Sequence, residues 1–311
     1  MSGTTGPALS RGAIIVSFMI ITGIWGSTWI VIHNQLGVVA PQWSVAYRFI
    51  IASLAMVAVA RWQGVSLRLP PGAGWIALWF GITQFCINFN AVYLAEHHIT
   101  SGLVATVFAL LMIPNALLAW VWLGQRPGRR FLLSSIPAIA GIVLLFVHEL
   151  RVDPSGAGDV LVGIALTLVG LVAASVANVL QATPAAGRVP LPAMLAWAMA
   201  IGAMIDILVA LIVAGPPSFE FRLGYVAGLF YLALAASALA FSLYIPVVRA
   251  IGPARAAYSS VLVPIIAMAL STLFEGYVWT SLAALGAIFA LGGMVFALSG
   301  RGRLGTAPDP A

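Results

Sequence analysis

The segment GLVATVFALLMIPNALLAWVWLGQRP at residues 102–127 resembles a second segment of the same chain, GPARAAYSSVLVPIIAMALSTLFEGYVW at residues 252–279. A constant offset of 150 residues aligns three pairs at once: Gly102 with Gly252, Pro114 with Pro264, and Gln125 with Glu275. Further along, AGIVLLF at 140–146 resembles GGMVFAL at 292–298. These repeats predict a chain of two related halves, residues 13–149 and 159–299.

The composition places both halves in a lipid bilayer. Hydrophobic residues make up 62% of the 311 residues and charged residues only 7%, with a mean hydropathy of +1.08. A soluble domain carries about 25% charged residues, so this chain cannot cover a water-exposed surface in the usual way. All 14 basic residues are arginines scattered between apolar runs, which excludes the clustered basic face of a nucleic-acid-binding protein.

Arginine, acidic and Pro-Gly positions divide the chain into apolar runs of about the length that one bilayer crossing needs, roughly 20 residues. Ten such runs lie near residues 13–32, 43–61, 73–94, 101–123, 131–149, 159–181, 192–215, 223–248, 256–274 and 279–299. The loops between them are short. We therefore predict an all-α integral membrane protein with ten transmembrane helices.

The distribution of arginines orients these helices. With a cytoplasmic N-terminus, eleven arginines fall in segments on the cytoplasmic side, at positions 11, 61, 68, 126, 129, 130, 188, 249, 255, 301 and 303. Only Arg151 and Arg222 fall outside, and Arg48 lies within a span. By the positive-inside rule, we expect the N-terminal tail (1–12) and the C-terminal tail (300–311) both to be cytoplasmic.

The repeat and the topology together indicate a transporter. Each half contains five spans, and because five is odd, the second half enters the membrane from the opposite side. Inverted repeats of this kind recur in secondary transporters, whose substrate site lies near mid-membrane between the halves. The sequence therefore favours a small-molecule substrate and transport by alternating access.

Several motifs carry a family resemblance. The chain has WGSTW at 25–29, AYRFIIASL at 46–54, and in each half a proline followed eleven residues later by an amide or acid, Gln125 or Glu275. In these features it resembles the EamA-type drug/metabolite transporter superfamily from residue 13 to 299, and within it the bacterial aromatic amino acid exporters. The resemblance implies export of amino acids, aromatic or neutral, or of related small metabolites. Gln125 departs from the glutamate of many family repeats.

Neutral polar side chains within the spans form one set of substrate-binding candidates: Thr28, Gln84, Asn88, Asn115, Ser175, Asn178 and Gln181. The pair 84 and 88 and the pair 178 and 181 each share a helix face, at spacings of four and three residues. Amides and hydroxyls can hold the amino and carboxylate groups of a zwitterion. The alternative is that these residues form hydrogen bonds between helices, each worth about 0.6–2 kcal/mol.

A second set lies on one face of the eighth run, where Phe230, Ser237, Phe241 and Tyr244 are spaced by seven, four and three residues. Trp25 and Tyr258 lie near polar neighbours in the first and ninth runs. Aromatic side chains with a few polar groups are typical of small-molecule cavities. Simple core packing is the alternative.

Two ionisable residues lie inside spans, Arg48 and Asp206. Intramembrane charges are costly and indicate function, so a gating or coupling role is one hypothesis. The other is structural anchoring, because Arg48 lies near enough to the end of its span to snorkel towards the headgroups.

No catalytic, nucleotide-binding or metal-binding motif occurs in the sequence, so we predict a non-enzyme without cofactor or bound metal. Its partners are then the substrate and the lipid bilayer, and the protein is a monomer or a weak oligomer. Other interpretations are a transporter of another metabolite or drug-like substrate, an intramembrane lipid-modifying enzyme, and a channel or scaffold.

Overall fold

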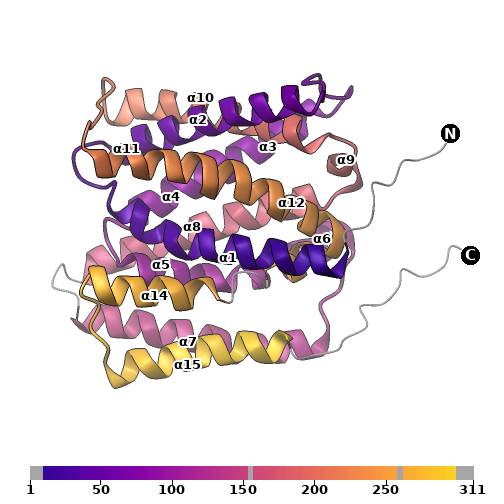
Figure 1. Ribbon diagram of the computed structural model, residues 1–311. Helices are drawn as coiled ribbons and strands as arrows, with labels where there is room; N and C mark the ends of the chain where they lie inside the picture. The colour runs from indigo at the N-terminus through magenta and orange to yellow at the C-terminus, as the bar shows by residue number, and fades with distance from the viewer. Residues whose placement is uncertain (1–9, 153–156, 258–261, 299–311) are drawn as a thin grey trace, which may run out of the picture.

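The computed structural model describes residues 10–152, 157–257 and 262–298, and every regular element within these ranges is a helix (Figure 1). The predicted tails lie almost entirely outside the described residues. The first half contains α1 (Arg11–His33), α2 (Pro41–Trp62), α3 (Gly74–Phe80), η1 (Gly81–Asn88), α4 (Phe89–Ala95), α5 (Ser101–Phe108), η2 (Ala109–Leu111), α6 (Met112–Leu123) and α7 (Arg129–Val152).

The second half contains α8 (Ala157–Gln181), α9 (Pro184–Gly187), α10 (Leu191–Val213), α11 (Leu223–Phe230), η3 (Tyr231–Leu239), α12 (Ala240–Ile251), α13 (Pro253–Ala256), α14 (Val263–Phe274) and α15 (Ser281–Leu298). Nine of the ten apolar runs match the helices to within three residues at each end. In the ninth run, predicted from residue 256, α13 ends at Ala256 and α14 begins only at Val263, with residues 258–261 outside the described residues. The prediction of an all-helical membrane protein is confirmed.

Eight helices of 21 to 29 residues are long and apolar enough to cross a bilayer among the described residues. Three of them combine consecutive elements that run on without a break: α3, η1 and α4; α5, η2 and α6; and α11, η3 and α12. Two shorter apolar helices, Val263–Phe274 and Ser281–Gly293, lie in the ninth and tenth predicted runs. A continuous helix satisfies its own backbone polar groups, which a bilayer core requires.

Local sequence explains where these helices begin and end. The Ser10 side chain accepts a hydrogen bond from the Ala13 amide at 3.1 Å and caps α1. Proline occupies the first position of α2, α9 and α13, where its fixed φ suits a helix start. Gly124 ends α6 with a φ of 69°, a left-handed conformation that glycine adopts at no steric cost.

Three helices contain a stretch with a different winding. The segments η1 and η3 are π-helical, and they begin at equivalent positions 150 residues apart, Gly81 and Tyr231. The 3₁₀ turn η2 lies just before Pro114, which lacks an amide hydrogen and clashes with regular α-helix on its N-terminal side. Such irregular turns frequently occur at functional sites.

The helices pack side by side as a bundle (Figure 1). At one edge α2 packs along α10, and at the other α7 packs along α15. Between these edges, α1 contacts α12 and α14, and α8 contacts α4 and α6. Each of the edge pairs joins a helix of the first half to one of the second.

Glycines let the two halves approach closely. A Cβ atom on Gly81 would lie 2.6 Å from the carbonyl oxygen of Ala198 in α10, and one on Gly141 would lie 2.3 Å from the amide nitrogen of Ala290 in α15. Backbone therefore touches backbone at both edges, as is common where transmembrane helices associate through small residues. The start of α1 and the end of α15 lie on the same side of the bundle (Figure 1).

Candidate functional site

A cavity of about 90 Å³ lies between the two halves. Its lining comes from α1, α2, η1, α4, α5 and η2 of the first half and from α8, α12 and α14 of the second. Because helices of both halves supply lining side chains, the cavity lies at the interface between the halves.

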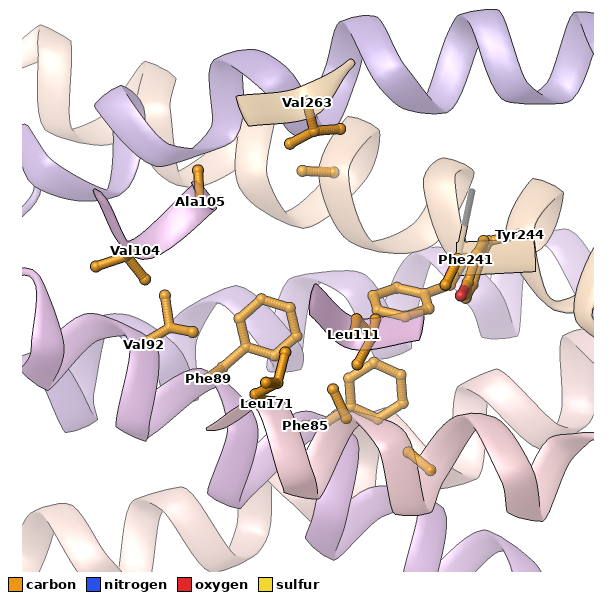
Figure 2. Packing of buried hydrophobic residues seen from close by; sticks show 14 of the residues in the cluster. Phe85, Phe89, Val92, Val104, Ala105, Leu111, Leu171, Phe241, Tyr244 and Val263 are labelled. Carbon is orange, nitrogen blue, oxygen red and sulfur yellow. The ribbon is translucent and has the colours of Figure 1, made fainter. Parts of the chain in front are cut away.

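Aromatic rings form one wall of this cavity. Trp25 packs edge-on against Phe241 and Tyr244, with ring centroids 5.6 and 5.0 Å apart. Figure 2 shows Phe89 of the lining and Phe85, which is not part of the lining, beside Phe241, at centroid distances of 6.4 and 5.2 Å. Edge-to-face pairs at these distances are favourable beyond the area that they bury, so the wall is firmly packed.

Amide and hydroxyl groups lie among the rings. Gln84, Asn88 and Asn178 line the cavity and are at most 4% exposed. The Asn88 Oδ1 atom is buried without a hydrogen-bond partner among the described residues. Thr28 donates to the carbonyl oxygen of Ile24 at 2.9 Å, which satisfies its hydrogen locally. The cavity therefore offers a free acceptor in Asn88.

Arg48 is the one charged side chain in the described lining of the cavity, and it is completely buried. Its Nε atom donates to Ser237 Oγ at 2.9 Å. The Cζ atom lies 4.3 Å from the ring centroid of Phe89 and 5.4 Å from that of Phe49. The side chain thus faces the bundle interior, and the snorkelling expectation is wrong because α2 turns this residue towards the second half.

These contacts do not fully compensate the charge of Arg48. Burying an ion costs several kcal/mol even after relaxation. A hydrogen bond from a charged donor returns about 1.5–3 kcal/mol, and a cation–π contact about 0.5–2 kcal/mol. Yet Nη1 and Nη2 make no hydrogen bond of normal geometry among the described residues, and the polar group beside the guanidinium is the Tyr93 hydroxyl.

Two further groups act on this guanidinium. The Tyr93 hydroxyl lies beside it and donates to Gln35 Oε1 at 3.0 Å. The carboxylate of Glu96 acts through space. Burial and the charge of Glu275 raise the pKa of Glu96 well above its ordinary value, although Arg48 opposes this rise. Burial thus opposes the charged form of Glu96, the acid that acts on Arg48.

Glu275 connects α14 to the start of α5. Its carboxylate accepts hydrogen bonds from the Ser101 amide at 3.1 Å, from the Ser101 hydroxyl, and from Ser271 Oγ at 2.6 Å. A carboxylate at a helix N-terminus is stabilised by the free amide groups and the helix dipole. His33 at the end of α1 lies 3.8 Å away. This cluster joins the two halves at one end of the bundle.

Asp206 lies outside the cavity lining and is fully buried. Its Oδ1 atom accepts a hydrogen bond from Asn90 Nδ2 at 2.7 Å, whereas Oδ2 has no hydrogen-bond partner among the described residues. The three ion pairs found in the described part of the chain do not include Arg48 or Asp206. The structure thus gives these two candidates separate neighbours.

The structure brings seven of the proposed substrate-binding residues to the cavity: Trp25, Thr28, Gln84, Asn88, Asn178, Phe241 and Tyr244. Five others lie elsewhere: Asn115, Ser175, Gln181, Phe230 and Ser237. Tyr258 lies outside the described residues. Ser237 still belongs to the site indirectly, since it holds Arg48.

Phe230 points away from the cavity and is 49% exposed. In an α-helix a residue seven positions before Ser237 would share its face. The intervening segment Tyr231–Leu239 is π-helical, and Ser237 Oγ bonds the carbonyl oxygen of Leu232, five residues back. The extra residue in each turn rotates Phe230 off the face that Ser237 presents.

Two amides outside the cavity form hydrogen bonds between helices, which is the alternative role considered for the neutral polar side chains within the spans. Asn115 Nδ2 donates to the carbonyl oxygen of Pro253 at 3.0 Å. Gln181 Oε1 accepts from Arg249 Nη2 at 2.9 Å. These bonds tie α6 and the end of α8 to the segment around α12 and α13.

Sequence reasoning missed several lining side chains, among them Trp29, Phe89 and Phe108. Trp29 follows Trp25 by one helical turn, and Phe89 follows Phe85 likewise, so the four-residue spacing was the available signal. Apolar residues at this spacing are equally common on lipid-facing surfaces. No group of three or more His, Cys, Asp or Glu side chains that could hold a metal occurs in the described residues.

Comparison with known proteins gives a consistent result. Residues 12–147 match the EamA-like transporter family. The uncharacterized inner membrane transporter YedA of Escherichia coli strain K12 is 29% identical over 88% of this chain and 86% of its own length. Protein PagO of Salmonella typhimurium is 24% identical over 44% of this chain, a match that spans 46% of the PagO length.

The fold is also shared with a solved crystal structure, at a TM-score of 0.69 and 19% identity, over 93% of this chain and 97% of the other. At that identity, the likeness concerns the fold alone. This multi-pass membrane protein is thus similar to the EamA-like transporter family over its first half, and to a relative described as an inner membrane transporter over most of its length.

Proposed function

We propose that this protein is a secondary transporter that exports aromatic or neutral amino acids, or related small metabolites, across the inner membrane by alternating access. The observation that carries the proposal is the cavity between the two halves, which combines an aromatic wall with buried amides and a charged group. Sites of this composition, apolar with a few placed polar groups, are typical of small-molecule binding.

The proposal includes ten membrane crossings in two inverted halves. The π-helical segments η1 and η3 begin 150 residues apart, at the same offset as the sequence repeat. Contacts between the halves also come in equivalent pairs. The contacts of α1 with η3, α12 and α14 have counterparts in those of α8 with η1, α4 and α6. This pattern supports an internal two-fold relation between the halves.

The orientation with both tails in the cytoplasm belongs to the same proposal. An even number of crossings returns the chain to its starting side, and the described chain begins and ends on one side of the bundle (Figure 1). The arginine distribution places that side in the cytoplasm. Because one chain forms a complete cavity, the monomer is proposed as the transporting unit.

The proposed substrate class follows from the lining. Phe89, Phe241 and Trp25 suit an aromatic or aliphatic side chain, and the amides suit the polar end of an amino acid. The resemblance to the aromatic amino acid exporter YddG points the same way. A volume of about 90 Å³ is below the range of about 300–1,000 Å³ usual for ligand sites, so substrate entry requires a change of conformation. Alternating access supplies such a change.

Counterflow in proteoliposomes tests the proposal. Vesicles containing the purified protein and loaded with unlabelled tryptophan, phenylalanine or threonine are diluted into the labelled amino acid. We expect transient, saturable accumulation that protein-free vesicles do not show. Uptake at the control rate for every amino acid in the panel would refute the substrate assignment, and non-saturable uptake would indicate a channel. A wider panel of apolar drug-like compounds distinguishes the other substrates of this superfamily.

Asp206 is proposed as a coupling residue within this mechanism. Its Oδ2 atom makes no hydrogen bond of normal geometry among the described residues, and the Cys86 thiol lies beside the carboxylate. A proton can therefore be gained there without breaking the bond to Asn90. In Asp206→Asn we expect the flux to lose its dependence on pH. A flux-versus-pH profile identical to that of the wild type removes Asp206 from coupling.

A further inference from the structure

The guanidinium of Arg48 is built into the cavity with most of its donors unused. The side chain is completely buried and lines the cavity, and Nε is held by Ser237 Oγ at 2.9 Å. This bond leaves the end of the guanidinium that carries Nη1 and Nη2, neither of which has a hydrogen-bond partner among the described residues. That pair of parallel donors matches the two oxygens of a carboxylate.

The charge of Arg48 also has no fixed counter-charge close by. None of the three ion pairs of the described chain includes it. Glu96 is the acid that acts on it, and both of its oxygens are buried without hydrogen-bond partners among the described residues. Burial and the neighbouring Glu275 raise the pKa of Glu96. An anion entering the cavity would therefore meet a positive charge that has no ion-pair partner among the described residues.

The surroundings of Arg48 define what else such an anion must carry. Phe89, whose ring centroid lies 4.3 Å from Cζ, continues into the aromatic wall with Phe241 and Trp25. This wall suits an apolar body and disfavours a small hydrated ion. The Asn88 Oδ1 atom is a buried acceptor in the same cavity and suits an ammonium group.

We propose that Arg48 is the carboxylate-binding residue of this cavity, and that the transported molecules are monocarboxylates with an apolar or aromatic body. In an amino acid, the ammonium group would lie at Asn88. This inference rests on the proposed transport function and narrows its substrates to anionic or zwitterionic carboxylates. It also replaces gating and anchoring as the role of Arg48.

Pairs of ligands that differ only in the carboxylate test the inference. Indole-3-propionate is compared with tryptamine, and tryptophan with tryptophanamide, as competitors of labelled tryptophan in counterflow. Direct binding is measured separately as protection of the purified protein against heat. We expect each carboxylate to bind at least about 30-fold more tightly than its partner, the effect typical of a buried charge pair that loses one member.

Variants then assign this preference to Arg48. Arg48→Gln should abolish it, and Arg48→Lys should retain only part of it, because an ammonium lacks the paired donors. Arg61→Gln is the matched control, since Arg61 is exposed at the other end of the same helix, and it should behave as the wild type. A folded Arg48→Gln protein with an unchanged preference overturns the inference.

The ligand series on the wild-type protein keeps the test decisive if Arg48→Gln does not fold. Equal binding of indole-3-propionate and tryptamine, or equal protection by sodium sulfate, overturns the carboxylate site. Saturable tryptophan flux without any carboxylate preference defeats this inference and leaves the proposed function standing. Strong protection by carboxylates without flux of any substrate defeats the proposed transport function and leaves the carboxylate site standing.

Discussion

Gly293 lies where α15 packs against α7, and replacing it by alanine tests that contact. A Cβ atom at this position would lie 2.6 Å from the amide nitrogen of Ala138 and 3.0 Å from its Cα atom. Gly292 is its neighbour in the same helix, and a Cβ atom there meets nothing within 4 Å. Gly292→Ala is therefore a matched control with the same chemistry and no new contact.

The size of the effect follows from these distances. The atoms opposite Gly293 are largely backbone, which cannot move aside by changing rotamer, so the two helices must separate. Overpacking of this kind costs about 1–3 kcal/mol. The gain in helix propensity, up to about 1 kcal/mol, is common to both variants and cancels. With an unfolding entropy of about 2.1 cal/mol/K per residue, this difference lowers the Tm by roughly 2–5 °C relative to the control.

Cys86 provides the assay, because it is the only cysteine and is 8% exposed. A thiol-reactive fluorogenic dye added during heating reports the temperature at which this side chain becomes accessible. We expect Gly293→Ala to react at a lower temperature than Gly292→Ala. Equal midpoints for the two variants would show that α7 and α15 do not pack through Gly293, and the reasoning would fail.

Three further predictions concern the site. Glu275→Gln removes the negative charge that accepts hydrogen bonds from Ser101, a loss of about 1.5–3 kcal/mol. Amide hydrogen exchange in the first turn of α5 should therefore become faster. Unchanged exchange would mean that Glu275 does not stabilise the start of α5. The raised pKa of Glu96 means that the folded state binds its proton more tightly than the unfolded state does. This contribution to stability is fully present below the ordinary pKa of 4.5 and is lost as the pH rises through the pKa of Glu96 in the folded protein. The Tm of the wild type should therefore fall across this pH range, and the Tm of Glu96→Gln should fall less. Parallel profiles of Tm against pH for the two proteins would contradict this prediction. Phe241→Ala should weaken counterflow of tryptophan at least about tenfold, whereas Phe230→Ala, on the exposed face of the same span, should leave it unchanged; equal effects would argue against the cavity as the substrate site.

Much of the architecture was accessible from the sequence alone. A helix that crosses a bilayer needs a certain length of apolar residues, and this requirement acts on each segment separately. Nine of the ten runs therefore predicted the helix ends to within three residues, and only the start of the ninth run differs, where α14 begins at Val263. The motifs around Arg48 and the two prolines are likewise local, and they carry the resemblance to EamA-type transporters.

Which side chains meet was decided by the tertiary structure, because it depends on how each helix is rotated and on what it faces. Asn88 and Asn115 are both buried amides in spans, yet one lines the cavity and the other bonds Pro253. The π-helical turns before Ser237 rotated Phe230 out to an exposed face, and apolar periodicity carries no signal of such a turn.

The two glutamates and the arginine make the same point. From the sequence, Glu96 and Glu275 are residues at loops 179 positions apart, and Arg48 is a charge near the end of a span. Only the packing of the two halves places Glu275 on the start of α5, surrounds Glu96 with protein, and turns Arg48 inward onto Phe89. Hydrophobicity along the chain determines where it crosses the bilayer, and the contacts between the crossings determine which charges the cavity contains.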